Sequence, residues 1–186
     1  PDSEREQACD ALVRSRGRVL DEKLVRSRGP RSERGLPAVR EGLPGGAALV
    51  SFLRCEDEPA PFARQARYVA FVVRAGREPI DACDLGAAAG LDSLVARWRA
   101  AVLGDGHRPA ANGPSQVIGD HLRRRLWDPL QAALAGAPRV FVVLDGALDA
   151  VDLYALPAGN GSFLVESGMV IERLSAEREL TVGPPL

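Results

Sequence analysis

Three cysteines and two histidines are the side chains of this sequence best suited to nucleophilic or acid–base chemistry. A cysteine attacks as the thiolate, so it needs a histidine, a helix N-terminus or a cation beside it. Cys9 falls on an expected terminal helix among charged residues, and Cys55 closes an apolar strand. Cys83 lies in an expected outer strand between Asp81 and Asp84, whose charges raise the pKa of a thiol. We interpret all three as structural or incidental thiols.

Neither histidine stands in a pattern typical of a catalytic base or a metal ligand. His107 falls in a loop rich in glycine and proline, and His121 falls on the surface of a predicted helix. The three cysteines show no CxxC or other metal-ligand spacing, and their odd number argues against a disulfide framework. No GxxxxGK[ST] or GxGxxG motif follows a strand. We therefore expect no metal and no cofactor, and a reducing, cytoplasmic location.

Asp145 is the most interesting carboxylate because it ends an unbroken apolar run, Val140 to Leu144. Such a run is typical of a strand that is covered on both faces. Functional loops of α/β proteins follow strands of this kind. We favour a turn residue over a catalytic acid at Asp145. An unrelated α/β small-molecule enzyme centred on Asp145 stays open as an alternative, and it would require a deep pocket with a perturbed carboxylate there.

Charge and hydropathy argue against nucleic-acid and membrane partners. The chain has 186 residues and a net charge of −1. The run Arg123, Arg124 and Arg125 has no aromatic residues interleaved and is expected to be a solvated helix face. No apolar run reaches the length of a membrane helix, and the first residues are too polar for a signal peptide. Because Met169 is the sole methionine, we expect an internal piece of a longer, arginine-rich bacterial protein.

The first part of the chain predicts helices. Apolar residues spaced for one helix face predict an amphipathic helix over residues 5–24, although Gly17 weakens it. The polar stretch 26–35 is expected to be a loop. Leu36, Val39 and Leu43 then make a short helical face, which ends at Pro44-Gly45-Gly46.

Strands and helices alternate in the remainder. The composition predicts strands over residues 47–55, 68–73, 80–85 and 140–144, of which the second and third form a hairpin with an outer third strand. Two helices are predicted over residues 91–103 and 115–126, the second with Ser115 as N-cap and both with a core tryptophan, Trp98 and Trp127. A break at Asp128-Pro129 and a restarted helix over 130–134 follow. Residues 56–65 and 104–114 are expected loops.

The last part of the sequence suggests further strands. Phe163 to Val165 and Met169 to Leu174 have the composition of a hairpin that turns through residues 166–168. Residues 180–186 are expected to begin another strand. Together these elements predict an α/β fold, a mixed sheet flanked by helices. Residues 1–44 are expected to form a helical lead-in arm and residues 45–186 the α/β domain.

Six segments, in this order, resemble CHAT-domain proteins, which are caspase-like members of the separase and caspase clan. They read PGGAALVSFLRC, YVAFVVRAG with a following DLG, LVARWRAAV, LRRRLWDPL, RVFVVLDGAL and ESGMVIERLSAEREL. The helix ALVRSRGRVLDEK is similar to the lead-in that joins tetratricopeptide repeats to the CHAT domain in that family. The resemblance covers the chain from about Ala11 onward.

The resemblance implies peptide-bond cleavage by a histidine–cysteine dyad. In the family, both residues lie downstream of the segment that matches LSAEREL, so no catalytic residue is carried over to this chain. The leading hypothesis is the amino-terminal, non-catalytic portion of a CHAT-type cysteine peptidase, with a protein or peptide partner and the downstream catalytic half of the same polypeptide. The alternative is an inactive CHAT scaffold in bacterial signalling or defence, which binds a partner through a sheet edge or its helical arm.

Overall fold

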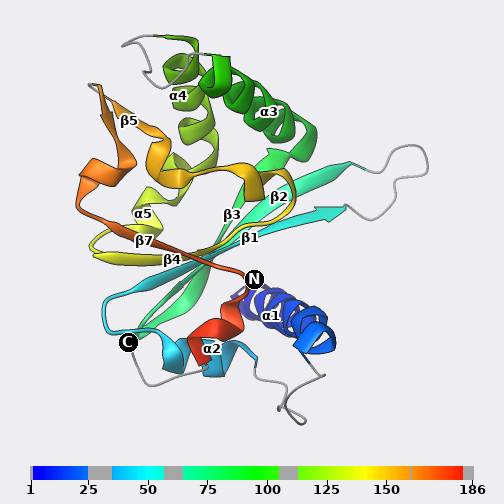
Figure 1. Ribbon diagram of the computed structural model, residues 1–186. Helices are drawn as coiled ribbons and strands as arrows, with labels where there is room; N and C mark the ends of the chain where they lie inside the picture. The colour runs from blue at the N-terminus through cyan, green and yellow to red at the C-terminus, as the bar shows by residue number, and fades with distance from the viewer. Residues whose placement is uncertain (1, 25–34, 57–64, 105–112, 160, 182–186) are drawn as a thin grey trace.

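A five-stranded mixed sheet is the centre of the molecule (Figure 1). The computed structural model describes residues 2–24, 35–56, 65–104, 113–159 and 161–181, without the side chains of 17–24. The strand order is β3-β2-β1-β4-β7. The strands are β1 (Ala48–Glu56), β2 (Ala66–Arg74), β3 (Arg77–Ala87), β4 (Arg139–Val143) and β7 (Val170–Leu174). The predicted fold class, a mixed sheet flanked by helices, is confirmed.

One half of the sheet is antiparallel and the other half is parallel. β1 pairs antiparallel with β2, and β2 with β3, so the expected hairpin with an outer strand is confirmed. β4 pairs parallel with β1 on one side and with β7 on the other. The connection from β3 back to β4 passes through the helices between residues 88 and 134, which is long enough for the crossover that a parallel pair needs. The carboxyl ends of β1, β4 and β7 therefore lie at one edge of the sheet.

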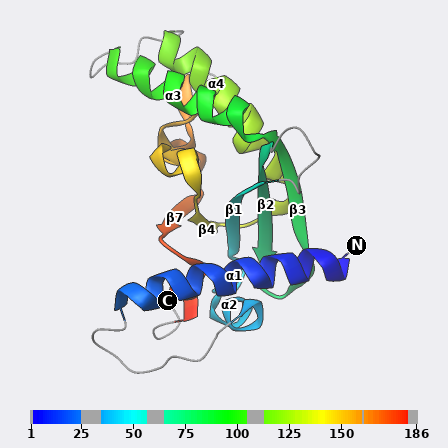
Figure 2. The same cartoon turned by 90° about the vertical axis from the view of Figure 1, so that its right-hand side faces the viewer.

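Helices cover both faces of the sheet (Figures 1 and 2). On one face lie α3 (Ala88–Gly104), α4 (Pro114–Leu126), the 3₁₀ helix η1 (Asp128–Leu130) and α5 (Gln131–Leu134). On the other lie α1 (Asp2–Leu24) and α2 (Leu36–Gly42). Val140 and Val142 of β4 pack into the core beneath α3 and α4, while Phe141 and Val143 pack into the core beneath α1 and α2. Residues alternate between two buried faces, which explains the unbroken apolar run.

The amino-terminal helices form one of the two covering layers. Cys9, Leu12 and Val13 of α1 are buried together with Leu36 and Val39 of α2. The predicted helices over 5–24 and around Leu36 are thus confirmed, although the side chains of the later α1 residues lie outside the described part. The boundary between an arm, 1–44, and a domain, 45–186, stays a prediction.

The helices α3 and α4 follow the prediction with two differences. Trp98 and Trp127 are buried in the core as expected, but Val102, an apolar residue of the predicted helix 91–103, is 43% exposed. Ser115 is not the N-cap of α4: Gly113 occupies that position without a side-chain hydrogen bond, and Pro114 begins the helix. Proline at the first helical position supplies the fixed backbone angle, so the helix starts one residue before Ser115. The break at Asp128 and the restarted helix are confirmed.

The predicted hairpin over residues 163–174 is wrong. Ser162–Phe163 (β6) pairs with Pro157–Gly159 (β5) in a separate two-stranded sheet, and a 3₁₀ helix, η4 (Leu164–Ser167), follows. β7 instead joins the main sheet parallel to β4, starting from a hydrogen bond between the Val170 N–H and the Pro138 carbonyl. Local composition predicts the strand β7 but not the strand with which it pairs. β7 pairs with β4 over five residues, whereas β6 has only two.

The expected strand at the end of the chain is also wrong as far as the structure describes it. Residues Glu177–Thr181 form a 3₁₀ helix, η5, and Leu180 packs against the core beneath α1 and α2. Two further 3₁₀ helices, η2 (Gly146–Ala150) and η3 (Leu153–Ala155), connect β4 to β5. Residues 182–186 and most of the loops predicted at 26–35, 56–65 and 104–114 lie outside the described residues. Among the described helices, none has the length and apolarity needed to cross a bilayer.

Candidate functional site

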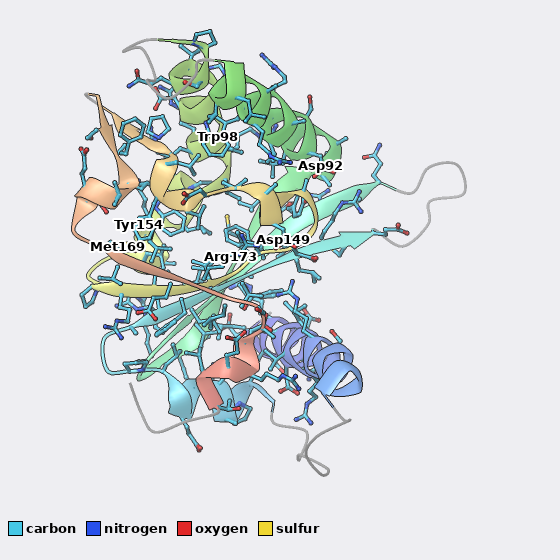
Figure 3. All side chains as sticks on the ribbon, viewed as in Figure 1. Asp92, Trp98, Asp149, Tyr154, Met169 and Arg173 are labelled. Atoms are coloured by element: carbon cyan, nitrogen blue, oxygen red, sulfur yellow. The ribbon has the colours of Figure 1, made fainter. Side chains whose placement is uncertain are left out.

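Charged side chains gather where β1, β4 and β7 end. Ligands of α/β proteins commonly bind at the carboxyl ends of parallel strands, so this edge is the first place to look for a site. Arg54 lies near the end of β1, Asp145 follows β4, and Glu177 follows β7. Arg16 reaches the same place from α1. Figure 3 draws the side chains on the ribbon and labels Asp149 and Arg173, an ion pair that lies beside the sheet.

Asp145 is a capping residue. One carboxylate oxygen accepts a hydrogen bond from the Gly146 N–H at 2.9 Å, at the start of η2, and the other accepts from the Arg54 N–H at 2.8 Å. The second oxygen also lies 3.4 Å from the Arg16 guanidinium. These bonds join the loop after β4 to β1 and α1. Asp145 is therefore occupied in the turn, as the favoured interpretation expects.

Arg16 ties α1 to three other elements. Its Nη1 lies 2.7 Å from Glu177 Oε1, and its Nη2 donates to the Phe52 carbonyl of β1. The Arg16 side chain is 16% exposed and that of Glu177 is 0% exposed. Burying such a pair is costly unless most of its polar atoms are bonded. One oxygen of Glu177, Oε2, has no hydrogen-bond partner among the described residues.

The sequence interpretation missed the Arg16–Glu177 pair, because the two residues are 161 positions apart. Both residues stand among polar and charged neighbours in the sequence, so no local pattern marked either of them.

Tyr68 braces the loop after β4 from the other side. Its hydroxyl donates to Asp92 Oδ1 at 2.8 Å and accepts from the Ala147 N–H at 3.1 Å. Burial, together with the bond to Asp92, raises the pKa of Tyr68 to about 12. Gly146 passes close by with φ of 59°, and a Cβ there would lie 2.7 Å from the Tyr68 hydroxyl oxygen. Only glycine fits this turn.

The three thiols lie on three different elements, α1, β1 and β3. Cys9 is fully buried, and burial, with a smaller contribution from Glu177, raises its pKa to about 12. Burial also raises the pKa of Cys83, and Asp84 adds to it as expected, although burial is the larger cause. Cys55 Sγ lies 3.8 Å from the Arg67 carbonyl oxygen. Arg40 and Arg16 act to lower the pKa of Cys9, but burial outweighs both, so this site does not favour a thiolate.

The histidines and the arginine run occupy the surface. His121 is exposed on α4, and within the described ranges no hydrogen bond joins it to a thiol. His107 lies outside the described residues. Arg124 and Arg125 are exposed, but Arg123 is not simply solvated, since it pairs with Asp120 at 3.7 Å and with Asp128 at 2.5 Å. Its role is to fix the end of α4. In the same described ranges, no three histidine, cysteine or acidic side chains are grouped to hold a metal ion.

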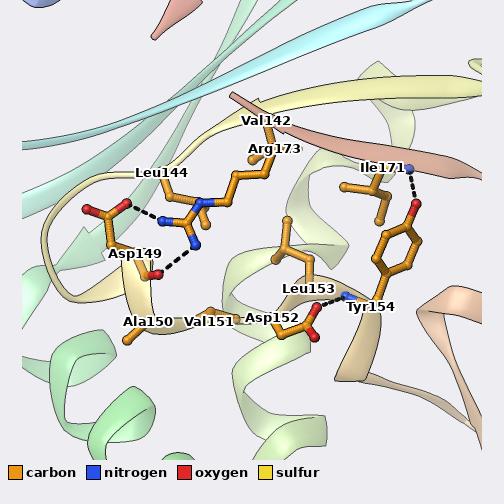
Figure 4. Close-up of a pocket in the computed structure, with 10 residues that line it drawn as sticks. All are labelled: Val142, Leu144, Asp149, Ala150, Val151, Asp152, Leu153, Tyr154, Ile171 and Arg173. Carbon is orange, nitrogen blue, oxygen red and sulfur yellow. Dashed lines mark hydrogen bonds and ion pairs between the residues drawn. The ribbon is translucent and has the colours of Figure 1, made fainter. Parts of the chain in front are cut away.

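A pocket of about 450 Å³ opens between β4, β7 and the 149–154 segment (Figure 4). Its walls are apolar and come from Val142, Leu144, Val151, Leu153 and Ile171. Asp145 does not line this pocket, so the pocket gives no support to the alternative of a small-molecule enzyme centred on Asp145.

The rim of the pocket is polar. The Arg173 guanidinium donates to the Asp149 carbonyl at 2.8 Å and to its carboxylate at 3.0 Å (Figure 4). The Tyr154 hydroxyl accepts from the Ile171 N–H at 2.7 Å. Asp152 also faces the rim, where its carboxylate accepts from the Tyr154 N–H. The sequence interpretation did not single out any of these residues.

Comparison with known proteins finds no family model, no curated protein and no solved structure that matches this chain.

Proposed function

We propose that this chain is the amino-terminal, non-catalytic portion of a CHAT-type caspase-like protein. The six ordered segments that resemble the family support this, and so does an α/β fold with a mixed sheet covered by helices on both faces. The observation that carries the proposal is the state of the carboxyl edge. Its charged groups, Arg16, Asp145 and Glu177, are bonded to one another and to backbone rather than directed at an open cleft.

In this proposal the chain forms part of the scaffold beside the active site and supplies no catalytic residue. A downstream histidine would serve as base and a downstream cysteine as nucleophile, with backbone amides holding the oxyanion. The residues described here would contribute a rigid parallel half-sheet beside that dyad. The bonds that Asp145 and Tyr68 make in the loop after β4 hold this loop in one conformation.

A peptidase assay on the purified chain tests the proposal. We expect no turnover of a mixed peptide substrate, because within the described ranges no thiol is bonded to an imidazole, and burial raises the pKa of Cys9 and of Cys83. Turnover that disappears in Cys55→Ala or Cys83→Ala would refute it. In the parent polypeptide, we expect turnover that depends on a cysteine beyond Leu186 and is unchanged by Cys55→Ala.

An inactive scaffold is the second candidate, and the outer edge of β7 favours it. A sheet edge with unpaired backbone groups is a common docking place for an extended peptide. The parent polypeptide would then bind a partner but cleave nothing.

A further inference from the structure

The pocket between β4, β7 and the 149–154 segment is apolar inside and charged at its rim (Figure 4). Its volume of about 450 Å³ lies in the range of small-molecule sites, roughly 300–1,000 Å³. The wall residues Val142, Val151 and Leu153 are at most 5% exposed. At the rim, the side chains of Arg173 and Asp149 are 53% and 58% exposed. A ligand that fits this pocket therefore buries an apolar body and leaves a polar group at the rim.

Hydrogen bonds hold the pocket in shape without a ligand. The Tyr154 hydroxyl accepts from the Ile171 N–H at 2.7 Å, and the Tyr154 N–H donates to Asp152 Oδ1 at 3.0 Å. Arg173 donates to the carbonyl and the carboxylate of Asp149. These bonds tie the 149–154 segment to β7 at two places. A pocket that is already ordered loses less conformational entropy when a ligand binds.

The backbone of β7 beside the pocket offers little to an extended peptide. The Ile171 N–H is used by Tyr154, and the Ser175 N–H donates to Glu179 Oε1 at 2.6 Å. An added strand is held mainly by main-chain hydrogen bonds, and here two of the donors are already occupied. Recognition in this pocket therefore depends on its walls and its rim charge, which favours a small molecule over an extended peptide.

The rim carries one negative charge more than it carries positive charges. The charged residues that line the pocket are Asp149, Asp152 and Arg173. Arg173 pairs with Asp149 at 3.0 Å, so these two charges offset each other. The Asp152 carboxylate accepts from the Tyr154 N–H, and within the described part of the chain no arginine, lysine or histidine forms an ion pair with it. A cation at the rim complements this charge, whereas an anion meets an uncompensated carboxylate.

We propose that this pocket binds a small molecule with an apolar ring system inside the walls and a protonated amine at the rim beside Asp152. This goes beyond the proposed function, since it requires no dyad and no cleavage.

The test compares three ligands that share an indole ring and differ in the charge of the side chain. They are tryptamine, a cation, tryptophol, which is neutral, and indole-3-propionate, an anion. Amide chemical shifts of the whole chain are followed during each titration. We expect tryptamine to bind with a Kd of about 1 mM or tighter, with shifts at residues 142–144, 149–154 and 171–173. We expect tryptophol to bind about threefold more weakly than tryptamine, and indole-3-propionate to bind most weakly of the three.

Variants of the rim test the part that charge plays. Asp152→Asn keeps an oxygen that accepts from the Tyr154 N–H but removes the charge, so tryptamine should bind no better than tryptophol, whose own Kd should stay the same. In the double variant Asp149→Asn and Asp152→Asn, Arg173 is the only charged residue left on the rim, and indole-3-propionate should become the tightest ligand. The matched control is Glu41→Gln, which removes an exposed negative charge from α2 on the other face of the sheet and should leave all three Kd values unchanged.

Several results would overturn the proposal. They are no binding of tryptamine, equal binding of the three ligands, shifts centred outside the pocket, or an equal effect of Glu41→Gln and Asp152→Asn. Binding of a lysine-containing peptide at these residues without binding of tryptamine would show that the occupant is a peptide. The comparison of the three ligands needs no variant, so it decides even if a substitution unfolds the chain. The peptidase assay does not depend on this pocket, so the two proposals can fail separately.

Discussion

Arg16 of α1 and Glu177 of η5 form an ion pair with an N–O distance of 2.7 Å, although 161 positions separate them. The same guanidinium lies 3.4 Å from Asp145 and donates to the Phe52 carbonyl. One side chain from the first helix thus holds the ends of β1, β4 and β7 together. These bonds fix α1 to the carboxyl edge of the sheet.

Removing Arg16 should be strongly destabilising. Arg16→Met leaves Glu177 buried without its cation, which costs about 3 kcal/mol or more of unfolding free energy. Urea unfolding at neutral pH measures this loss. Arg5→Met is the control, since the Arg5–Asp2 pair is 48% and 63% exposed, and it should change stability by less than about 0.5 kcal/mol. Adding Glu177→Leu to Arg16→Met should restore most of the loss, and a double variant no better than the single one would contradict this account.

Gly146→Ala should destabilise for two separable reasons. Its φ of 59° is unfavourable for alanine, and the new Cβ would meet the Tyr68 hydroxyl at 2.7 Å and Arg54 Cδ at 2.9 Å. Gly76→Ala provides the matched control, because its φ is 70° and no atom lies within 4 Å of the added Cβ. We expect a loss of about 1 kcal/mol at Gly76 and clearly more at Gly146, measured by thermal unfolding. Equal losses at the two positions would rule out the clash.

Cys9 should be unreactive in the folded chain. Since burial raises its pKa to about 12 from a usual value of 9.0, almost no thiolate forms at pH 8. We expect iodoacetamide to modify Cys9 only at the rate at which the chain opens, as mass spectrometry of the labelled peptides would report. Labelling of native Cys9 as fast as a free thiol would contradict the buried placement.

The same raised pKa predicts alkaline instability. Between about pH 9 and 12 the unfolded chain loses the Cys9 proton while the folded chain keeps it, so the unfolded state binds fewer protons. Stability therefore falls as pH rises through this range, by up to about 1.4 kcal/mol per pH unit for one group. Cys9→Ala should have a flatter profile between pH 9 and 10 than the unaltered chain, in unfolding curves taken at each pH. Identical slopes would be inconsistent with the shift.

The Tyr68 hydroxyl should ionise at a higher pH than an exposed tyrosine does. Its pKa of about 12, against a usual 10.0, follows from burial and from the bond to Asp92. The difference in ultraviolet absorbance between the unaltered chain and Tyr68→Phe, recorded against pH, should show this group ionising close to the alkaline unfolding transition. Tyr68→Phe should also lose about 1 kcal/mol or more, because the Ala147 N–H and Asp92 each lose a partner. A midpoint near pH 10 would mean that the hydroxyl is exposed.

The strands and helices with strong periodicity were predictable. The run from Val140 indicated a strand buried on both faces, and Leu91, Val95 and Trp98 indicated the buried face of α3. Ser115 was assigned the wrong role because a serine before a helix is a frequent cap, while Pro114 had already started the helix. Predictions fail where a position has two locally acceptable roles.

By itself the sequence determined the local elements, the covering of β4 on both faces and the glycine-bearing turn after it, because these depend on residues close together in the chain. Only the tertiary structure decided that β7 lies parallel to β4 and not in a hairpin with residues 163–165. It alone brought Arg16 to Glu177 and formed the pocket between β4, β7 and the 149–154 segment. The physical reason is that pairing and burial depend on which surfaces remain uncovered after the sheet has formed, and that information is spread over the whole chain.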